Sequence, residues 1–354
     1  MKMLMNKKFK LIRIFVYTLV IPLFLSGTFK TAYADEKEFS LQAVNTAADN
    51  KTAASNKSPN SYLKKAIEDY TFGKNFKENK KHKKFVIAIL DTGVAVDKLS
   101  ILRNIDFIKG YNFCGSEEKG YDDNGHGTFI TSWLVDTISS LDKNISYSIM
   151  PLKILDCDKK GNSRLISWGI RYAVLNGAKV INISCGAKKP LKELEEAVKF
   201  AYENNVIVVA SAGNYGEKNL LYPASYDSYA ISVGAVDSNG KRANYSNYGE
   251  SLFITAPGGD LNKPVYALGF NKETPEIFCT LGKEGTSVSA AYITAFVAYL
   301  VSEGYDTPDK VKKMLIQSSI DLGPKGKDKY YGWGLINPKK ILETVYKEKL
   351  KQKN

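Results

Sequence analysis

The 354-residue chain is long enough to bury a large core, since 44% of its residues are apolar and they are spread through most of its length. Its formal charge of +13 would suit a nucleic-acid-binding protein, but six lysines and arginines and no acidic residue fall in the first 34 positions, which leaves +7 for the rest. No helical stretch combines clustered arginine with aromatic residues, so the sequence argues against DNA or RNA binding.

Residues 1–34 have the pattern of a signal peptide. A basic stretch precedes an apolar run over residues 14–25, and Ala32-Tyr33-Ala34 has the small-x-small form that signal peptidase accepts. The run is shorter than the roughly 20 residues that a spanning helix needs. We therefore expect a secreted protein, cut before Asp35, that meets the membrane only transiently through its signal; an uncleaved anchor is the alternative.

Residues 35–60 are rich in Ala, Asn, Lys, Ser and Thr and poor in apolar residues, so we expect a short pro-segment or linker there. One domain is predicted over residues 61–345, followed by a polar tail over residues 346–354. Continuous apolar runs rich in β-branched residues recur in the domain, which is typical of strands buried on both faces of a parallel sheet. These runs cover residues 85–90, 149–155, 180–183, 206–210 and 230–235.

Helical spacing of apolar residues occurs between several of these runs, at residues 165–175 and 194–201. Further on, Thr307-Pro308 predicts the start of a helix that runs to about Gln317. Alternating strands and helices predict an α/β fold, a doubly wound and mostly parallel sheet with helices on both faces. In such sheets the active site lies at the carboxyl ends of the strands.

The four cysteines permit two disulfides in an extracellular protein, or four free buried thiols. They are Cys114, Cys157, Cys185 and Cys279. With only two histidines and no Cys-x-x-Cys pair, the sequence predicts no zinc site.

Asp91 comes directly after the run at residues 85–90, so its carboxylate is expected at the carboxyl end of a buried strand. Of the two histidines, His82 lies in a lysine-rich stretch, whereas His126 stands between glycines at the start of a predicted helix. Taken singly, each has an ordinary structural explanation, Asp91 as a turn cap and His126 as a helix-terminus residue.

Ser287 leads into a further apolar stretch, where a serine is usually a helix cap. As a nucleophile in that place, it would meet the positive end of the helix dipole in its transition state. Asn214 follows the run at residues 206–210, and its carboxamide either donates a hydrogen bond to an oxyanion or forms a turn. Four such motifs, in this order on one α/β pattern, are hard to explain as separate structural features.

The motifs at Asp91, His126 and Ser287 resemble those of the subtilisin-like serine peptidases, over about residues 60–340. The resemblance implies that Asp91 holds the imidazole of His126, and that His126 takes the hydroxyl proton of Ser287 as Ser287 attacks the scissile carbonyl. It implies that Asn214 and the backbone N–H of Ser287 stabilise the oxyanion, without any required cofactor.

The resemblance also implies that a peptide substrate binds as an extended strand. The matching segments are Ser184-Cys185-Gly186 and Ser211-Ala212-Gly213, which would flank the pocket for the residue before the cut. Two positions depart from the family pattern: Phe129 replaces a frequent second histidine, and Ala291-Tyr292 replaces a common proline. Neither departure touches the proton relay.

The predicted helix from Thr128 to about Ser140 lacks the insertion that forms the strong calcium site of many secreted relatives. We therefore expect no tightly held metal, although a weak structural calcium site is left open. The pro-segment is shorter than the folded inhibitor domain of degradative subtilisins. With secretion and a Lys-, Asn-, Ile- and Tyr-rich composition, this resembles the leader peptidases that mature lanthionine-containing bacteriocins (lantibiotics).

The sequence thus favours a monomeric, secreted serine endopeptidase that processes one family of precursor peptides. A broad-specificity degradative subtilisin is the main alternative. An inactive protein of the same fold that only binds peptides is a second, and a phosphoryl-transfer enzyme built on Asp91 is a third. The last lacks a second acid or a phosphate cradle beside Asp91.

Overall fold

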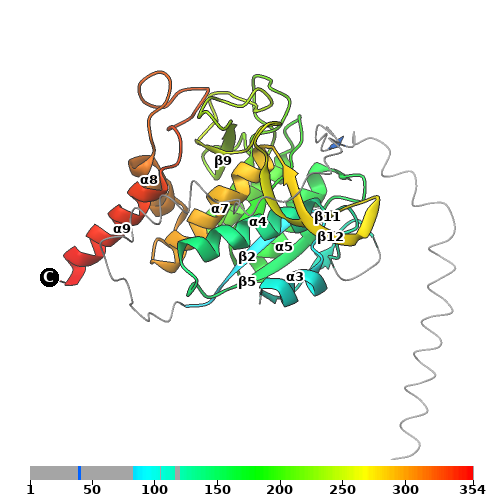
Figure 1. Ribbon diagram of the computed structural model, residues 1–354. Helices are drawn as coiled ribbons and strands as arrows, with labels where there is room; N and C mark the ends of the chain where they lie inside the picture. The colour runs from blue at the N-terminus through cyan, green and yellow to red at the C-terminus, as the bar shows by residue number, and fades with distance from the viewer. Residues whose placement is uncertain (1–38, 41–82, 104, 116–119, 354) are drawn as a thin grey trace, which may run out of the picture. The chain divides into compact units, whose positions relative to one another are not determined.

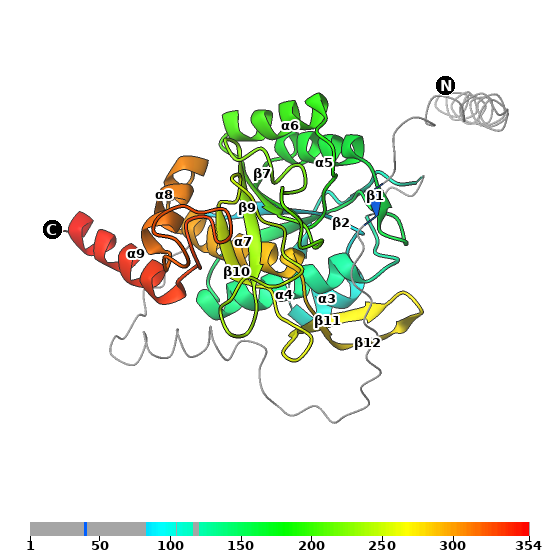
Figure 2. The ribbon, with the colours of Figure 1, turned by 90° about the horizontal axis from the view of Figure 1, so that it is seen from above.

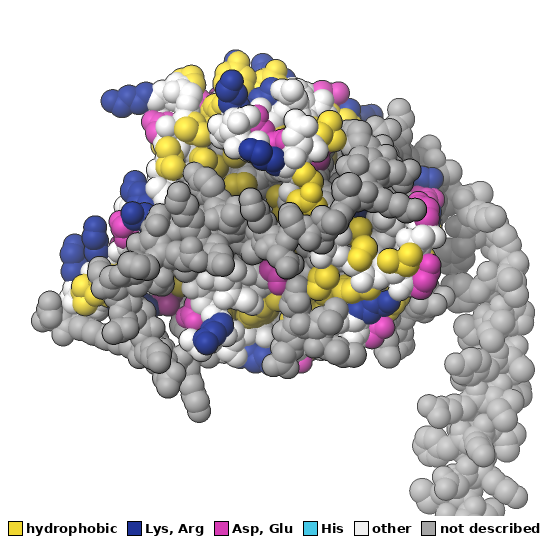
Figure 3. All heavy atoms as spheres, viewed as in Figure 1, with side chains coloured by type: hydrophobic (Ala, Val, Ile, Leu, Met, Phe, Trp, Pro, Cys, Tyr) yellow, Lys and Arg dark blue, Asp and Glu magenta, His cyan; other side chains and the backbone are white. Residues whose placement is uncertain are grey.

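The computed structural model describes residues 39–40, 83–103, 105–115 and 120–353 (Figure 1). The predicted signal peptide, and the predicted pro-segment apart from residues 39–40, lie outside the described residues. In the described part of the chain, none of the helices combines the length and the apolar character of a membrane span. Basic and acidic side chains are interspersed on the face drawn in Figure 3.

A parallel sheet forms the centre of the fold, as the apolar runs predict. Within the described residues it has eight strands in the order β10-β9-β8-β7-β2-β5-β3, with β4 also paired to β5, and all of these pairings are parallel. The strands are β2 (Phe85–Asp91), β3 (Asp106–Phe107), β4 (Tyr111–Asn112), β5 (Tyr147–Lys153), β7 (Ala178–Ile183), β8 (Ile207–Ser211), β9 (Ala230–Val236) and β10 (Ile254–Pro257). The chain winds outward from β2 in both directions, so the predicted doubly wound α/β fold is confirmed.

Helices cover both faces of the sheet, because alternate side chains of a strand point to opposite sides. Ile87 and Ile89 of β2 belong to the core that α4 and α7 cover, whereas Ala88 and Leu90 belong to the core under α5 and α6. Figure 2 shows the two helix layers. The helices are α3 (Val96–Arg103), α4 (His126–Leu141), α5 (Ser163–Leu175), α6 (Lys192–Glu203), α7 (Thr286–Ser302), α8 (Pro308–Ser318) and α9 (Pro338–Lys353).

The helix starts follow the predicted signals. Helix α4 begins at His126 and continues without interruption, and α8 begins at Pro308 with the Thr307 hydroxyl oxygen accepting the backbone N–H of Lys310 at 3.3 Å. Helix α9 includes most of the residues predicted as a polar tail. The four cysteines are free, and among them only Cys185 is buried.

Among the described residues, two further strand pairs lie outside the central sheet. Strands β11 (Val265–Asn271) and β12 (Thr274–Lys283) form an antiparallel hairpin that packs against α4. Strand β1 (Phe39–Ser40) pairs antiparallel with β6 (Lys160–Gly161). Neither pair was predicted from the sequence.

Candidate active site

Asp91 and His126 are in direct contact. Asp91 is the last residue of β2 and is fully buried, and its Oδ1 lies 2.7 Å from Nδ1 of His126, the first residue of α4. The same oxygen accepts the backbone N–H of Thr92 at 2.7 Å. Gly127 makes this approach feasible, because a Cβ there would lie 2.1 Å from the carbonyl oxygen of Gly93. The start of α4 can therefore sit directly on the end of β2.

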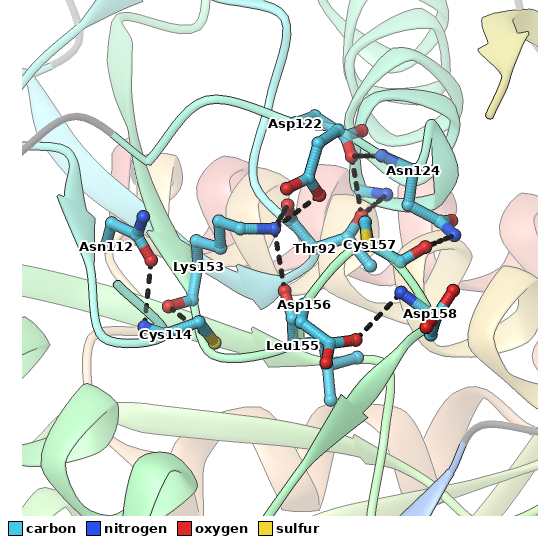
Figure 4. Close-up of polar contacts among 12 residues, drawn as sticks. Thr92, Asn112, Cys114, Asp122, Asn124, Lys153, Leu155, Asp156, Cys157 and Asp158 are labelled. Carbon is cyan, nitrogen blue, oxygen red and sulfur yellow. Dashed lines mark hydrogen bonds and ion pairs between the residues drawn. The ribbon is translucent and has the colours of Figure 1, made fainter. Parts of the chain in front are cut away.

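A buried carboxylate that the sequence reading missed, Asp122, ties these two elements together (Figure 4). Its two oxygens accept five hydrogen bonds. Oδ1 accepts from the hydroxyl of Thr92 and the backbone N–H groups of Asn124 and Gly125, each at 2.9 Å, and Oδ2 accepts from the Thr128 backbone N–H at 2.9 Å and its hydroxyl at 2.6 Å. Asp122 thus holds both Thr92, the residue after Asp91, and the backbone on either side of His126. An Asp four residues before a Gly-flanked histidine was the signal available in the sequence.

Lys153, at the end of β5, holds the backbone that follows Asp91. Its buried ammonium group donates to the carbonyl oxygens of Thr92 and Leu155, each at 2.9 Å, and to Asp123 Oδ1 at 2.6 Å (Figure 4). A buried charge needs such partners. The backbone that carries Asp91 is therefore held on two sides.

Ser287 and Asn214 form a second group of neighbours. Ser287 is the second residue of α7 and is 4% exposed, and Asn214 lies three residues beyond β8. Asn214 Oδ1 accepts from the backbone N–H and the hydroxyl of Thr286, at 2.8 and 2.7 Å. The amide group of Asn214 is therefore left as a donor. A Cβ placed on Gly285 would lie 3.1 Å from Asn214 Nδ2 and 3.2 Å from Ser287 Oγ, so a glycine keeps the space between them open.

The two segments expected to flank the substrate lie on either side of Leu221. Residues 184–186 follow β7, and residues 211–213 end and follow β8. A Cβ on Gly186 would lie 2.7 Å from Leu221 Cβ, and one on Gly213 would lie 2.9 Å from Leu221 Cγ. The Ser184 hydroxyl accepts from Asn182 Nδ2 at 2.8 Å. These segments occupy the edge of the sheet that also carries Asp91.

Asp91, residues 184–186 and Asn214 therefore share the carboxyl-end edge of one parallel sheet, where α4 and α7 begin. The hydrogen bonds among the described residues do not include one between His126 and Ser287. In free enzymes the bonds between catalytic groups are often long, and they shorten when substrate binds. Chemically, the edge offers a hydroxyl at a helix N-terminus, an imidazole oriented by a buried carboxylate, and an amide donor beside the hydroxyl.

Comparison with known proteins identifies relatives of this chain. A model of the subtilase family matches residues 82–334. Subtilisin DY of Bacillus licheniformis is 32% identical over 264 residues, covering 71% of this chain and 88% of that protein. Subtilisin BL of Lederbergia lenta is 30% identical over 259 residues, with 71% and 88% covered. The crystal structure of a lanthipeptide protease matches with a TM-score of 0.65 at 24% identity, over 80% of this chain and 94% of that one. At that identity, the structural match shows a shared fold.

Proposed function

The chain belongs to the subtilase family and is a serine endopeptidase, and from this premise we propose that Asp91, His126 and Ser287 are its catalytic triad. The observation that carries the assignment is the 2.7 Å contact between His126 Nδ1 and the buried Asp91 Oδ1. With Nδ1–H donating to the carboxylate, Nε2 is the basic nitrogen. It takes the hydroxyl proton of Ser287 while the oxygen attacks the substrate carbonyl, and Asp91 stabilises the imidazolium that forms.

The attack turns the substrate carbonyl oxygen into an oxyanion, for which Asn214 Nδ2 and the backbone N–H of Ser287 are the donors. The position of Ser287 at the N-terminus of α7 adds the positive end of the helix dipole. When the tetrahedral intermediate collapses, His126 returns the proton to the leaving amine and the acyl group stays on Ser287. Water, deprotonated by His126, then releases the acyl group and restores the enzyme.

The substrate binds as an extended strand. In support, the chain's own Phe39–Ser40 pairs antiparallel with Lys160–Gly161 of β6, so the edge of this strand is able to pair with an extended segment. Backbone pairing of that kind supplies affinity without sequence preference, while side-chain contacts supply specificity. The partner is thus a peptide, and the proposed enzyme acts as a secreted monomer without a required cofactor.

The processing role is the finer part of the proposal: cleavage of the leader of a lanthionine-containing precursor peptide. It is supported by the fold that this chain shares with a lanthipeptide protease. A specific processing enzyme cleaves a set of leader peptides much faster than casein under the same conditions. Comparable rates on casein and on the leader peptides would favour the degradative alternative instead.

A fluorophosphonate probe separates the peptidase from an inactive peptide-binding protein of the same fold. We expect the active protein to be labelled on Ser287, located by mass spectrometry of the labelled fragment, and the Ser287→Ala protein to remain unlabelled. The reason is that only a serine activated by a neighbouring base attacks phosphorus at a useful rate. Failure of the folded wild-type protein to react would contradict the proposed function.

Replacement of Asn214 tests the oxyanion donor. Asn214→Asp keeps an oxygen that can accept from Thr286 but removes the amide donor, and Asn214→Ala removes both. Both variants are expected to lose about 10²- to 10³-fold in kcat with little change in KM, as for the corresponding donor in subtilisin. Steady-state kinetics on one peptide would measure this, with circular dichroism as the control for folding. A kcat within about threefold of wild type would remove Asn214 from the mechanism.

A further inference from the structure

Three segments far apart in the sequence meet around His126. Asn124 Nδ2, two residues before His126, donates to the carbonyl oxygen of Cys157 at 2.8 Å. A Cβ on Gly125 would lie only 2.0 Å from the carbonyl oxygen of Phe270, at the tip of the β11–β12 hairpin. The hairpin and the turn of residues 156–160 are also joined, because Lys272 forms an ion pair with Asp158. The hairpin and this turn therefore border the start of α4 where His126 lies.

The hairpin and the turn of residues 156–160 each place one lysine near the start of α4. Lys283 ends β12, four residues before Ser287, and its Nζ lies 5.5 Å from the ring centroid of Phe129, three residues after His126. Lys159 stands in the turn with a φ of 61° and immediately precedes β6, the strand that accepts an extended segment. Both side chains are partly buried. Among the described residues, neither ammonium group has a hydrogen-bond or ion-pair partner.

The nearby carboxylates of the described residues interact with the two lysines electrostatically, but none of them forms an ion pair with either lysine. Burial, with a smaller contribution from the positive charge of Lys159, lowers the pKa of Lys283 to about 8. The negative charges of Asp122, Asp91 and Glu273 oppose this shift. Burial likewise lowers the pKa of Lys159, opposed by the same three acids. These three acids are hydrogen-bonded elsewhere or exposed to solvent: Asp91 is hydrogen-bonded to His126, Asp122 accepts five hydrogen bonds, and Glu273 is exposed on the hairpin. The site thus holds two partly buried cations beside the catalytic base with no anion in contact.

We propose that Lys159 and Lys283, the lysine pair, form a recognition site for an acidic substrate side chain next to the scissile bond. This inference rests on the proposed function, and it names the substrate class: precursor peptides with Asp or Glu flanking the cleaved bond. A carboxylate there would accept charge-assisted hydrogen bonds from both ammonium groups and would raise the pKa of both lysines. A basic side chain at the same place meets two like charges, so the site also rejects basic sequences.

The segments that carry the lysine pair fit this role. Lys159 adjoins the strand that pairs with an extended segment, so it lies along the path of the peptide, and Lys283 stands on the strand that leads to the nucleophile. Lys160, which follows Lys159 in the chain, and Lys272, in the turn of the hairpin, are exposed, and Lys272 is already paired with Asp158. The partly buried pair is therefore better placed than the exposed lysines to discriminate between substrates, since water screens exposed charges.

The test begins with a peptide-library digest by the wild-type enzyme, read by mass spectrometry, which identifies a cleaved bond. Internally quenched peptides of that sequence are then made with Glu, Gln or Lys at each of the two positions on either side of the bond. At one or more positions, we expect kcat/KM for Glu to exceed that for Gln by about tenfold and that for Lys by about a hundredfold. In the Lys159→Met/Lys283→Met variant, the three peptides should be cleaved within about twofold of one another, because the charges that separate them are gone.

Two matched variants complete the experiment. Lys159→Arg/Lys283→Arg keeps both charges and should keep the preference, and Lys339→Met/Lys340→Met removes two exposed charges from α9 and should leave it unchanged. Wild-type cleavage without any preference for Glu, or a preference that survives loss of the lysine pair, would overturn this inference while leaving the peptidase intact. A wild-type enzyme that cleaves no peptide and does not react with the fluorophosphonate would overturn the proposed function, and the recognition site with it.

Discussion

Replacing His126 with alanine is expected to lower kcat about a millionfold with little change in KM, the size of the loss in subtilisin when its triad histidine is removed. The base is lost, so Ser287 must attack as an unactivated hydroxyl, whereas the contacts that bind the peptide remain. Asp91→Asn should cost less, about 10⁴-fold, because the imidazole is still present but is held in the wrong tautomer. Both losses are measured with one quenched peptide at enzyme concentrations high enough to record the residual rate.

The double variant sharpens this test. Triad residues act as one unit, so His126→Ala/Ser287→Ala should be no slower than either single variant. Losses that multiply in the double variant would mean that the two residues act independently, which is inconsistent with a proton relay. Fluorophosphonate labelling of the His126→Ala protein at the wild-type rate would contradict the role of the base in the same way.

Much of this fold follows from local patterns in the sequence. The runs at residues 85–90 and 180–183 are continuous and apolar, since the strands they form are buried on both faces, and they predicted β2 and β7 to within two residues. A buried parallel strand leaves little choice of structure. The contact between Asp91 and His126 was expected from the resemblance to a known family, because strand ends alone do not say which loop will cover them.

The elements that were not predicted are those whose signal depends on distant partners. Strand β10 has only four residues, and none of the ten residues of β12 is fully buried, so neither shows a continuous apolar run. The hairpin is stabilised by packing on α4, more than a hundred residues earlier in the chain. The proposed role of Lys159 and Lys283 can be recognised only in the folded protein, where that packing places them near His126. In the sequence they are two of many lysines.

Asp122 is the clearest example of such long-range dependence, and its replacement tests whether the site is held in place from outside the triad. In Asp122→Asn, an NH₂ group takes the place of one carboxylate oxygen and faces groups that are themselves donors, such as the Thr128 N–H and hydroxyl. Two buried donors then lose their acceptor, and the free energy of unfolding should fall by about 3 kcal/mol. Urea unfolding in the Ser287→Ala background would measure this without self-digestion.

The same substitution should slow catalysis in molecules that are still folded. Asp122 fixes Thr92, next to Asp91, to the first turn of α4, so its loss lets His126 shift relative to the carboxylate that orients it. A misplacement of about 1 Å costs on the order of a hundredfold in rate, and we expect kcat to fall by about that factor while KM changes little. Asp97→Asn, which removes an exposed carboxylate of α3, is the matched control and should change neither stability nor kcat appreciably. A destabilised Asp122→Asn enzyme with wild-type kcat would show that Asp122 supports the fold alone, and that the contact between Asp91 and His126 is maintained by the two elements that carry them.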